Sequence, residues 1–161
     1  QLARAYYFGD LGLKKSAKRA VQLWELSAKQ GHAGSYFHLG NSYQDGDGVK
    51  LDPKRAAKYY QQAAELGHAP GQSNLGYMYY HGKGVTKSTD EAVRWLKLAA
   101  AQGHPQAQYS LAVCYGNGEG VPVDLEEALR LYKRSAAGGI SEAQEQVERL
   151  DAYLLAIKTS R

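Results

Sequence analysis

The sequence predicts an all-α fold, an α/α superhelix (solenoid) built from tandem helix–turn–helix repeats. One glycine recurs at a fixed interval of 36 residues, and an alanine keeps the same interval. A fixed period between about 20 and 50 residues marks a repeat array, in which each repeat buries its apolar face against its neighbours. The two series are Gly31, Gly67, Gly103 and Gly139, and Ala20, Ala56, Ala92 and Ala128.

Each repeat contains two helical stretches separated by a glycine-rich turn. In the third repeat, Leu75, Met78 and Tyr79 lie at three- and four-residue steps and therefore share one helical face. The turn 82–85 follows, and a second apolar helical pattern begins after it. We expect helices near 2–9, 17–30, 33–45, 53–66, 69–81, 89–102, 105–116 and 125–137, with a terminal helix over 141–158.

Local signals mark where these helices begin and end. Ser88 precedes Glu91 by three residues, and this spacing is typical of a capping box, in which each side chain bonds the other residue's backbone N–H. Asp124 and Glu127 repeat the spacing one repeat later. Asp52 stands before a proline at the first helical position. The glycines of the 36-residue series suit the left-handed position that ends a helix.

The periodicity predicts one repeat domain over residues 1–161. It consists of a partial repeat at 1–32, full repeats at 33–68, 69–104 and 105–140, and a capping helix at 141–161. In the last helix Ala143, Val147 and Leu150 form one apolar stripe, which we expect to cover the open end of the fourth repeat. The stripe continues through Leu154 and Ile157, beyond the length of a repeat helix.

The repeats resemble a known family. The third repeat contains a Leu-Gly pair, a Gly-x-Gly-Val turn and a pair of adjacent alanines. The residues of this pattern are Leu75, Gly76, Tyr79, Gly82, Gly84, Val85, Ala92, Trp95, Ala99, Ala100 and Gly103. This pattern is similar to the Sel1-like repeat, a relative of the tetratricopeptide repeat. The resemblance implies an α-solenoid that serves as a scaffold or adaptor for other proteins. Ala112 departs from the pattern, because the other full repeats have glycine there, and one close helix contact is expected to be looser.

Composition suits a globular protein without a membrane span. Hydrophobic residues make up 43% of the 161 residues, and the mean hydropathy is −0.54. No apolar run approaches the roughly 18 residues that a transmembrane helix needs. Cys114 is the one cysteine and is expected to be packed inside. Because the chain begins with Gln1, we expect it to be a segment of a longer protein.

The sequence contains no pattern expected of an enzyme, a metal site or a cofactor site. His32, His68 and His104 lie one repeat apart, so they stand about 8–10 Å or more from one another and cannot share a zinc ion. We expect them to be helix-junction residues. The Gly-x-Gly turns lack the third glycine of a dinucleotide fingerprint and follow helices. No nucleophile and base are paired in a recognisable motif, so no catalytic residue is predicted.

The candidate partner-binding residues lie on the first helix of each repeat. If the superhelix resembles that of tetratricopeptide repeats, these helices line a concave groove. The positions differ between repeats, and their aromatic and amide side chains are typical of peptide-binding surfaces. They are Phe37, Asn41, Gln44, Asp45, Ser73, Tyr77, Tyr80, His81, Tyr109, Val113 and Asn117, with Phe8 and Arg149 at the two ends. This groove has no lysine or arginine cluster, so no clamp for a C-terminal carboxylate is expected.

The leading hypothesis is therefore a protein-interaction module, compatible with a place in a larger assembly. One alternative, implied by the resemblance, is a weak hydrolase like the cysteine-rich relatives, whose cysteines are absent here. Another is binding of nucleic acid or an anionic surface by basic residues of the second helices, for which the net charge of +4 gives little support. These basic residues are Lys58, Arg94, Lys97, Arg130, Lys133 and Arg134.

Overall fold

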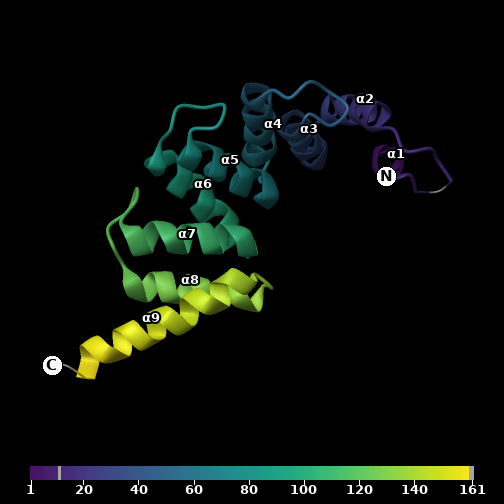
Figure 1. Cartoon of the computed structure of the whole chain (residues 1–161). Helices are drawn as coiled ribbons and strands as arrows, with labels where there is room; N and C mark the ends of the chain where they lie inside the picture. The colour runs from purple at the N-terminus through teal and green to yellow at the C-terminus, as the bar shows by residue number, and fades with distance from the viewer. Residues whose placement is uncertain (11, 160–161) are drawn as a thin grey trace. The chain divides into compact units, whose positions relative to one another are not determined.

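The computed structural model describes residues 1–10 and 12–159, and these form nine helices and no strand (Figure 1). They divide into two compact units, Gln1–Lys87 and Ser88–Arg161. The N-terminal unit contains α1 (Leu2–Phe8), α2 (Ala17–Ala28), α3 (Ala33–Asp45), α4 (Pro53–Glu65) and α5 (Ala69–His81). The C-terminal unit contains α6 (Thr89–Ala101), α7 (Pro105–Asn117), α8 (Leu125–Ala137) and α9 (Ser141–Thr159). The predicted fold class is confirmed, and every helix bound lies within two residues of its prediction.

Small side chains bring consecutive helices close together within each unit. The alanines of the 36-residue series, at 20, 56, 92 and 128, are all fully buried. Gly40 on α3 lies so near the Tyr60 ring of α4 that an added Cβ would stand 2.5 Å from it. Larger side chains such as Leu39, Leu75 and Leu96 fill the remaining space and are about 1% exposed.

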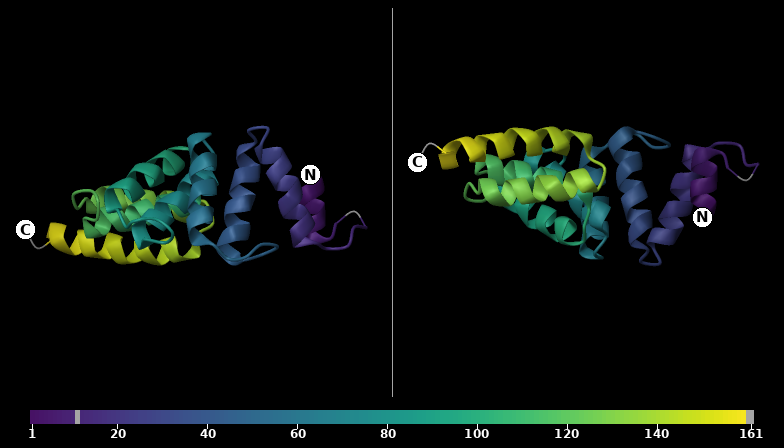
Figure 2. Two further views of the ribbon diagram at one scale, coloured as in Figure 1. Left: turned by 90° about the horizontal axis from the view of Figure 1, so that it is seen from above. Right: turned by 90° about the horizontal axis from the view of Figure 1, so that it is seen from below.

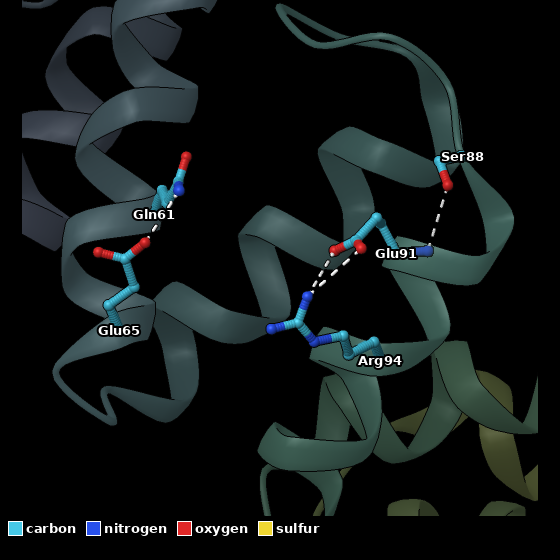
Figure 3. A network of polar contacts seen from close by, with 5 residues as sticks. All are labelled: Gln61, Glu65, Ser88, Glu91 and Arg94. Carbon is cyan, nitrogen blue, oxygen red and sulfur yellow. Dashed lines mark hydrogen bonds and ion pairs between the residues drawn. The ribbon is translucent and has the colours of Figure 1, made fainter.

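The second helices begin with the predicted side-chain caps. Asp52 accepts a hydrogen bond from the Arg55 N–H at 3.0 Å, and Asp124 accepts one from the Glu127 N–H at 2.9 Å. Ser88 caps α6 in the same way (Figure 3). The other half of the predicted capping box is not made there, because the Glu91 carboxylate pairs with Arg94 at 3.3 Å instead.

Two buried glutamines join the first helices to the end of the preceding second helix. Gln72 donates to the Ala64 carbonyl at 3.1 Å, and Gln108, one repeat later, donates to the Ala100 carbonyl at 3.3 Å. The last carbonyls of a helix lack partners within it, so each amide satisfies a group that would otherwise be buried without a hydrogen bond.

The turn inside each repeat contacts the start of the preceding second helix. Gly48 meets Ala17, Gly84 meets Pro53 and Gly120 meets Thr89, each through backbone atoms. All three glycines have positive φ, between 70° and 77°. A Cβ at position 120 would stand 2.5 Å from the Thr89 carbonyl oxygen, and one at position 84 would overlap the Pro53 carbonyl. These positions therefore require glycine both for their backbone conformation and for the close approach.

The last helix lies along α8, as both views of Figure 2 show. Ala143 and Val147 are buried, while exposure rises along the predicted stripe until Ile157 is 36% exposed. Lys133 pairs with Asp151 at 3.0 Å, and Lys158 lies 4.0 Å from Glu126, so the two helices run antiparallel.

Replacement of Gly84 by alanine should destabilise the protein far more than replacement of Gly67. Both glycines have positive φ, which costs an alanine about 1–2 kcal/mol. An added Cβ at position 67 meets nothing within 4 Å, whereas one at position 84 collides with the α4 backbone. We expect Gly84→Ala to lower the free energy of unfolding by at least about 2 kcal/mol more than Gly67→Ala. Urea unfolding followed by circular dichroism measures this difference, and equal losses would refute the close-contact account.

Deletion of residues 152–161 should cost little stability. Tyr153 and Leu155 are 55% and 64% exposed, and the Lys158–Glu126 pair is exposed, so few contacts stabilise the fold from this part of α9. We expect the melting temperature to fall by no more than about 3 °C, corresponding to roughly 1 kcal/mol. A fall of more than about 10 °C in the monomer would mean that the tail covers the repeat core.

Candidate functional site

Tyr77, Tyr80 and His81 form a contiguous aromatic group on the predicted binding face of the N-terminal unit. Tyr77 is 42% exposed, and its ring lies 4.3 Å from that of His81. His81 also meets the Tyr80 ring edge-on at 4.9 Å. Lys83 donates a hydrogen bond to the Tyr77 hydroxyl at 3.0 Å, and Lys87 lies over Tyr80. The rings are therefore held in place, while those of Tyr77 and His81 are exposed to solvent.

The predicted residues of α3 lie beside this unit's Tyr60 and are less exposed. The Tyr60 hydroxyl lies 2.7 Å from the Asn41 Oδ1 and 3.2 Å from the Gln44 Oε1. Phe37 is half-buried, with its ring 6.0 Å from Tyr60 and 5.0 Å from His68. Gln44 is exposed and Asn41 is half-buried. A partner would thus meet the amide of Gln44 and the edge of Phe37, while Asn41 mainly holds Tyr60.

Ser73 is buried, contrary to the expectation that it would face a partner. Its side chain is 3% exposed, whereas Phe37 and Tyr109, at the same register in their repeats, are half-buried. The serine is too short to reach the surface from a position where a large ring extends outward. It is therefore removed from the set of accessible binding residues.

In the C-terminal unit, Tyr109 and Asn117 lie on α7. The Tyr109 ring packs edge-on against Tyr132 at 5.5 Å and is half-buried. Asn117 is exposed, and its amide lies 3.5 Å from the Glu119 carboxylate. Cys114 on the same helix is 1% exposed, and burial raises the pKa of its thiol to about 11. A thiol with this pKa is almost entirely protonated near neutral pH and is a poor nucleophile.

A hollow lies among helices of the N-terminal unit. It encloses about 630 Å³ between α2, α3 and α4 and is lined by Tyr43, Tyr59, Glu25 and Arg55, among others. The two tyrosine rings stack at 5.5 Å, and Arg55 donates to the Tyr43 hydroxyl at 3.2 Å. Tyr43 is buried and Tyr59 is half-buried, so both rings also take part in the packing of this unit. The sequence does contain a sign of this group, because Arg55 stands twelve residues after Tyr43 and four residues, about one helical turn, before Tyr59.

The basic residues of the second helices are partly neutralised by their own helices. Arg94 pairs with Glu91, and Arg130 pairs with Glu127 in the same arrangement one repeat later. Figure 3 shows the first of these pairs beside the Ser88 cap. Lys133 is likewise paired, with Asp151. These acidic partners reduce the positive charge that a nucleic acid or an anionic surface would meet.

His68 and His104 are N-caps of the first helices. The His68 Nδ1 accepts from the Gly71 N–H at 3.2 Å, and the His104 Nδ1 accepts from the Ala107 N–H at 3.3 Å. His32 occupies the same position before α3 but makes no side-chain cap. Among residues 1–10 and 12–159, no cluster of three or more histidine, cysteine or acidic side chains has the arrangement of a metal site. The histidines thus lie at the helix junctions, and at two of the three junctions the ring caps the following helix.

Comparison with known proteins places these repeats in a described family. The Sel1 repeat model matches residues 1–32, 33–68, 69–104 and 105–140. A Sel1 repeat protein from Oxalobacter formigenes shares 35% identity over 91% of this chain, with a TM-score of 0.82. The protective antigen c5321 of uropathogenic Escherichia coli, which displays an SLR fold, shares 33% identity over 96% of this chain, with a TM-score of 0.89.

These relatives are longer than the chain. It spans 60% of the Oxalobacter protein and 33% of the Escherichia coli antigen. The cysteine-rich protein B of Helicobacter pylori shares the fold at 21% identity, with a TM-score of 0.64 over 83% of this chain and 96% of its own. No curated protein matches the chain. In the part that the structure describes, no helix combines the length and the apolar character needed to cross a bilayer.

The stability of the protein should fall as the pH drops below about 6.5, and His104 should contribute to this loss. Burial lowers the pKa of His104, so the unfolded chain takes up the proton at a higher pH than the folded chain does. The cap is therefore fully present above the ordinary pKa near 6.5 and weakens below it. His104→Asn keeps an acceptor at the N-cap and should lose less stability between pH 7.5 and 5.0.

Urea unfolding at the two pH values measures this difference. His32→Asn is the matched control, because His32 has the same helix position without a cap hydrogen bond. The cap interpretation is wrong if His104→Asn loses as much stability as the unmodified protein.

Proposed function

The chain belongs to the Sel1 repeat family, whose members generally act as protein-interaction scaffolds, and we propose that its first helices bind a peptide or an extended segment of a partner protein. The family is typically non-catalytic, and we propose the same for this chain. The function is then recognition: the repeat framework holds a set of side chains at fixed spacing, and the partner is chosen by those that differ between repeats.

The observation that supports this proposal is the exposed, immobilised aromatic group of α5. Tyr77 offers a large contact area, and His81 and Lys83 already fix its ring. A ring that is ordered before binding loses little conformational entropy when a partner covers it. Tyrosine also combines an apolar face with a hydroxyl, and it is enriched among residues that dominate binding energy.

Polar groups beside this aromatic group can bond a peptide backbone. The exposed Gln44 amide on α3 and the His81 ring on α5 each offer donor and acceptor capacity. An extended peptide has one N–H and one carbonyl per residue, so amide and imidazole groups match it without a net charge. In the C-terminal unit we propose that Tyr109 and Asn117 contribute in the same way.

Simultaneous replacement of Tyr77 and Tyr80 by alanine should weaken partner binding by about 2 kcal/mol or more, which is roughly 30-fold in Kd. A pull-down followed by mass spectrometry supplies the partner, and isothermal titration calorimetry on the identified segment gives Kd. The expected loss follows from removing two adjacent rings from the contact.

The matched controls are Leu66→Ala and Leu98→Ala. Both leucines are exposed, at 53% and 46%, and neither lies on a first helix. They should leave Kd unchanged. If the tyrosine double variant folds normally and binds with unchanged affinity, the first-helix face is not the binding surface.

A further inference from the structure

A pocket in the C-terminal unit lies between α7, α8 and α9. It encloses about 380 Å³, and its polar lining includes Asn117, Tyr132, Gln146 and Arg149. Leu125 and Leu150 supply apolar walls. The volume is in the range of small-ligand sites and is ample for one amino-acid side chain.

The equivalent place in the N-terminal unit is closed by side chains. Tyr60 and Tyr132 occupy the same register, two repeats apart. The Tyr60 hydroxyl has two side-chain acceptors within 3.2 Å, Asn41 and Gln44. Two repeats later these positions hold Val113 and Gly116, which have no side-chain hydrogen-bonding group. The pocket exists because two partners of the tyrosine have been lost.

The residue that contacts the tyrosine ring also differs between the two repeats. Gly40 accommodates the Tyr60 ring at a distance that a Cβ would not allow. Ala112 takes that position in the fourth repeat, while the Tyr132 ring still packs against Tyr109 at 5.5 Å, as the Tyr60 ring packs against Phe37 at 6.0 Å. A Cβ added at Gly116 would meet nothing within 4 Å, which shows open space where Gln44 stands in the earlier repeat.

Two polar groups of the pocket, the Tyr132 hydroxyl and the Arg149 guanidinium, have no hydrogen-bond or ion-pair partner among the described residues, whereas the Asn117 amide lies 3.5 Å from the Glu119 carboxylate. Tyr132 is 8% exposed, yet its hydroxyl makes no hydrogen bond with any described residue. No fully buried polar side-chain atom of the described residues lacks a partner, so this hydroxyl is not fully buried, and Tyr132 lines the pocket. Arg149 forms no ion pair in the described part of the chain, although it is close enough to act on the Tyr132 phenol. Burial raises the pKa of Tyr132 to about 12, so its hydroxyl stays protonated and can donate.

We propose that this pocket binds a glutamate side chain of the partner segment. A guanidinium, a phenol and two amides can all donate, and a carboxylate is the side-chain group that only accepts. Arg149 is the one charged residue of the lining and sets the sign of the ligand. The leucine walls suit the two methylenes of glutamate. This assignment deepens the proposed binding function and rests on it.

The test is a titration of the 15N-labelled protein with the blocked tripeptide acetyl-Leu-Glu-Leu-amide, followed by NMR. The Gly116 amide and the Arg149 side-chain N–H report on the pocket. We expect saturable shifts at both, with at least fivefold weaker binding of the matched peptide acetyl-Leu-Gln-Leu-amide. Gly116→Gln should abolish the shifts by filling the pocket, and Arg149→Gln should weaken binding at least fivefold.

Arg134→Gln is the matched control, because it removes one positive charge from α8 outside the pocket. It should bind like the unmodified protein. Gly116→Gln should fold normally, since glutamine is a better helix former than glycine, and Arg149 is exposed, so its variant remains informative if the first one unfolds. Equal affinity for the two peptides, binding that survives both variants, or no shifts at all would overturn the assignment.

These outcomes separate the pocket from the wider function. If the tripeptide gives no pocket shifts while Tyr77→Ala with Tyr80→Ala still weakens the full partner segment, the glutamate site alone is wrong. If the tripeptide binds at the pocket as described and the tyrosine variants have no effect on the partner, the aromatic face is wrong and the pocket stands.

Discussion

The backbone contact between each glycine turn and the start of the preceding second helix is the constraint on which the repeats depend. Gly48, Gly84 and Gly120 bring their turns against the N-termini of α2, α4 and α6, where no side chain would fit. The contact fixes how far each helix pair can lie from the one before it within a unit. It also explains why the glycine cannot drift in register: a turn shifted by one residue would present a Cβ to a helix backbone.

Because these contacts leave no space for a side chain, residues can differ between repeats only on helix faces that take no part in them. The Tyr60 and Tyr132 positions illustrate this. Asn41 and Gln44 bond the Tyr60 hydroxyl in one repeat, whereas Tyr132, at the same register two repeats later, lines a pocket. None of these substitutions touches a turn contact, so the binding surface can change without loss of the array. Recognition by such a protein therefore depends on differences between repeats, while stability depends on what they share.

The fold was predictable from sequence because its determinants are local and periodic. Apolar steps of three and four residues, the caps at Asp52 and Ser88, and the glycine turns each specify structure within one repeat. The candidate site was predictable only in part. Ser73 is buried because exposure depends on side-chain length at a given register, which a helical pattern does not describe. The pocket beside Tyr132 needs three helices to meet, and so does the tyrosine-lined hollow, whose lining comes from α2, α3 and α4. Contacts of this kind depend on how side chains of different helices pack, and the periodic pattern of the sequence does not predict them.

A saturation scan with two readouts tests the division between framework and recognition most directly. Every position would be substituted in a displayed library, with protease resistance reporting folding and a 12-residue peptide, enriched from a random library on the unmodified protein, reporting binding. The account predicts that substitutions at the turn glycines Gly48, Gly84 and Gly120, and at the buried alanines of the 36-residue series, lower protease resistance. It predicts that substitutions at Tyr77, Tyr80 and Arg149 lower binding while resistance is kept. Binding losses confined to the shared framework, or spread evenly over both faces, would contradict it.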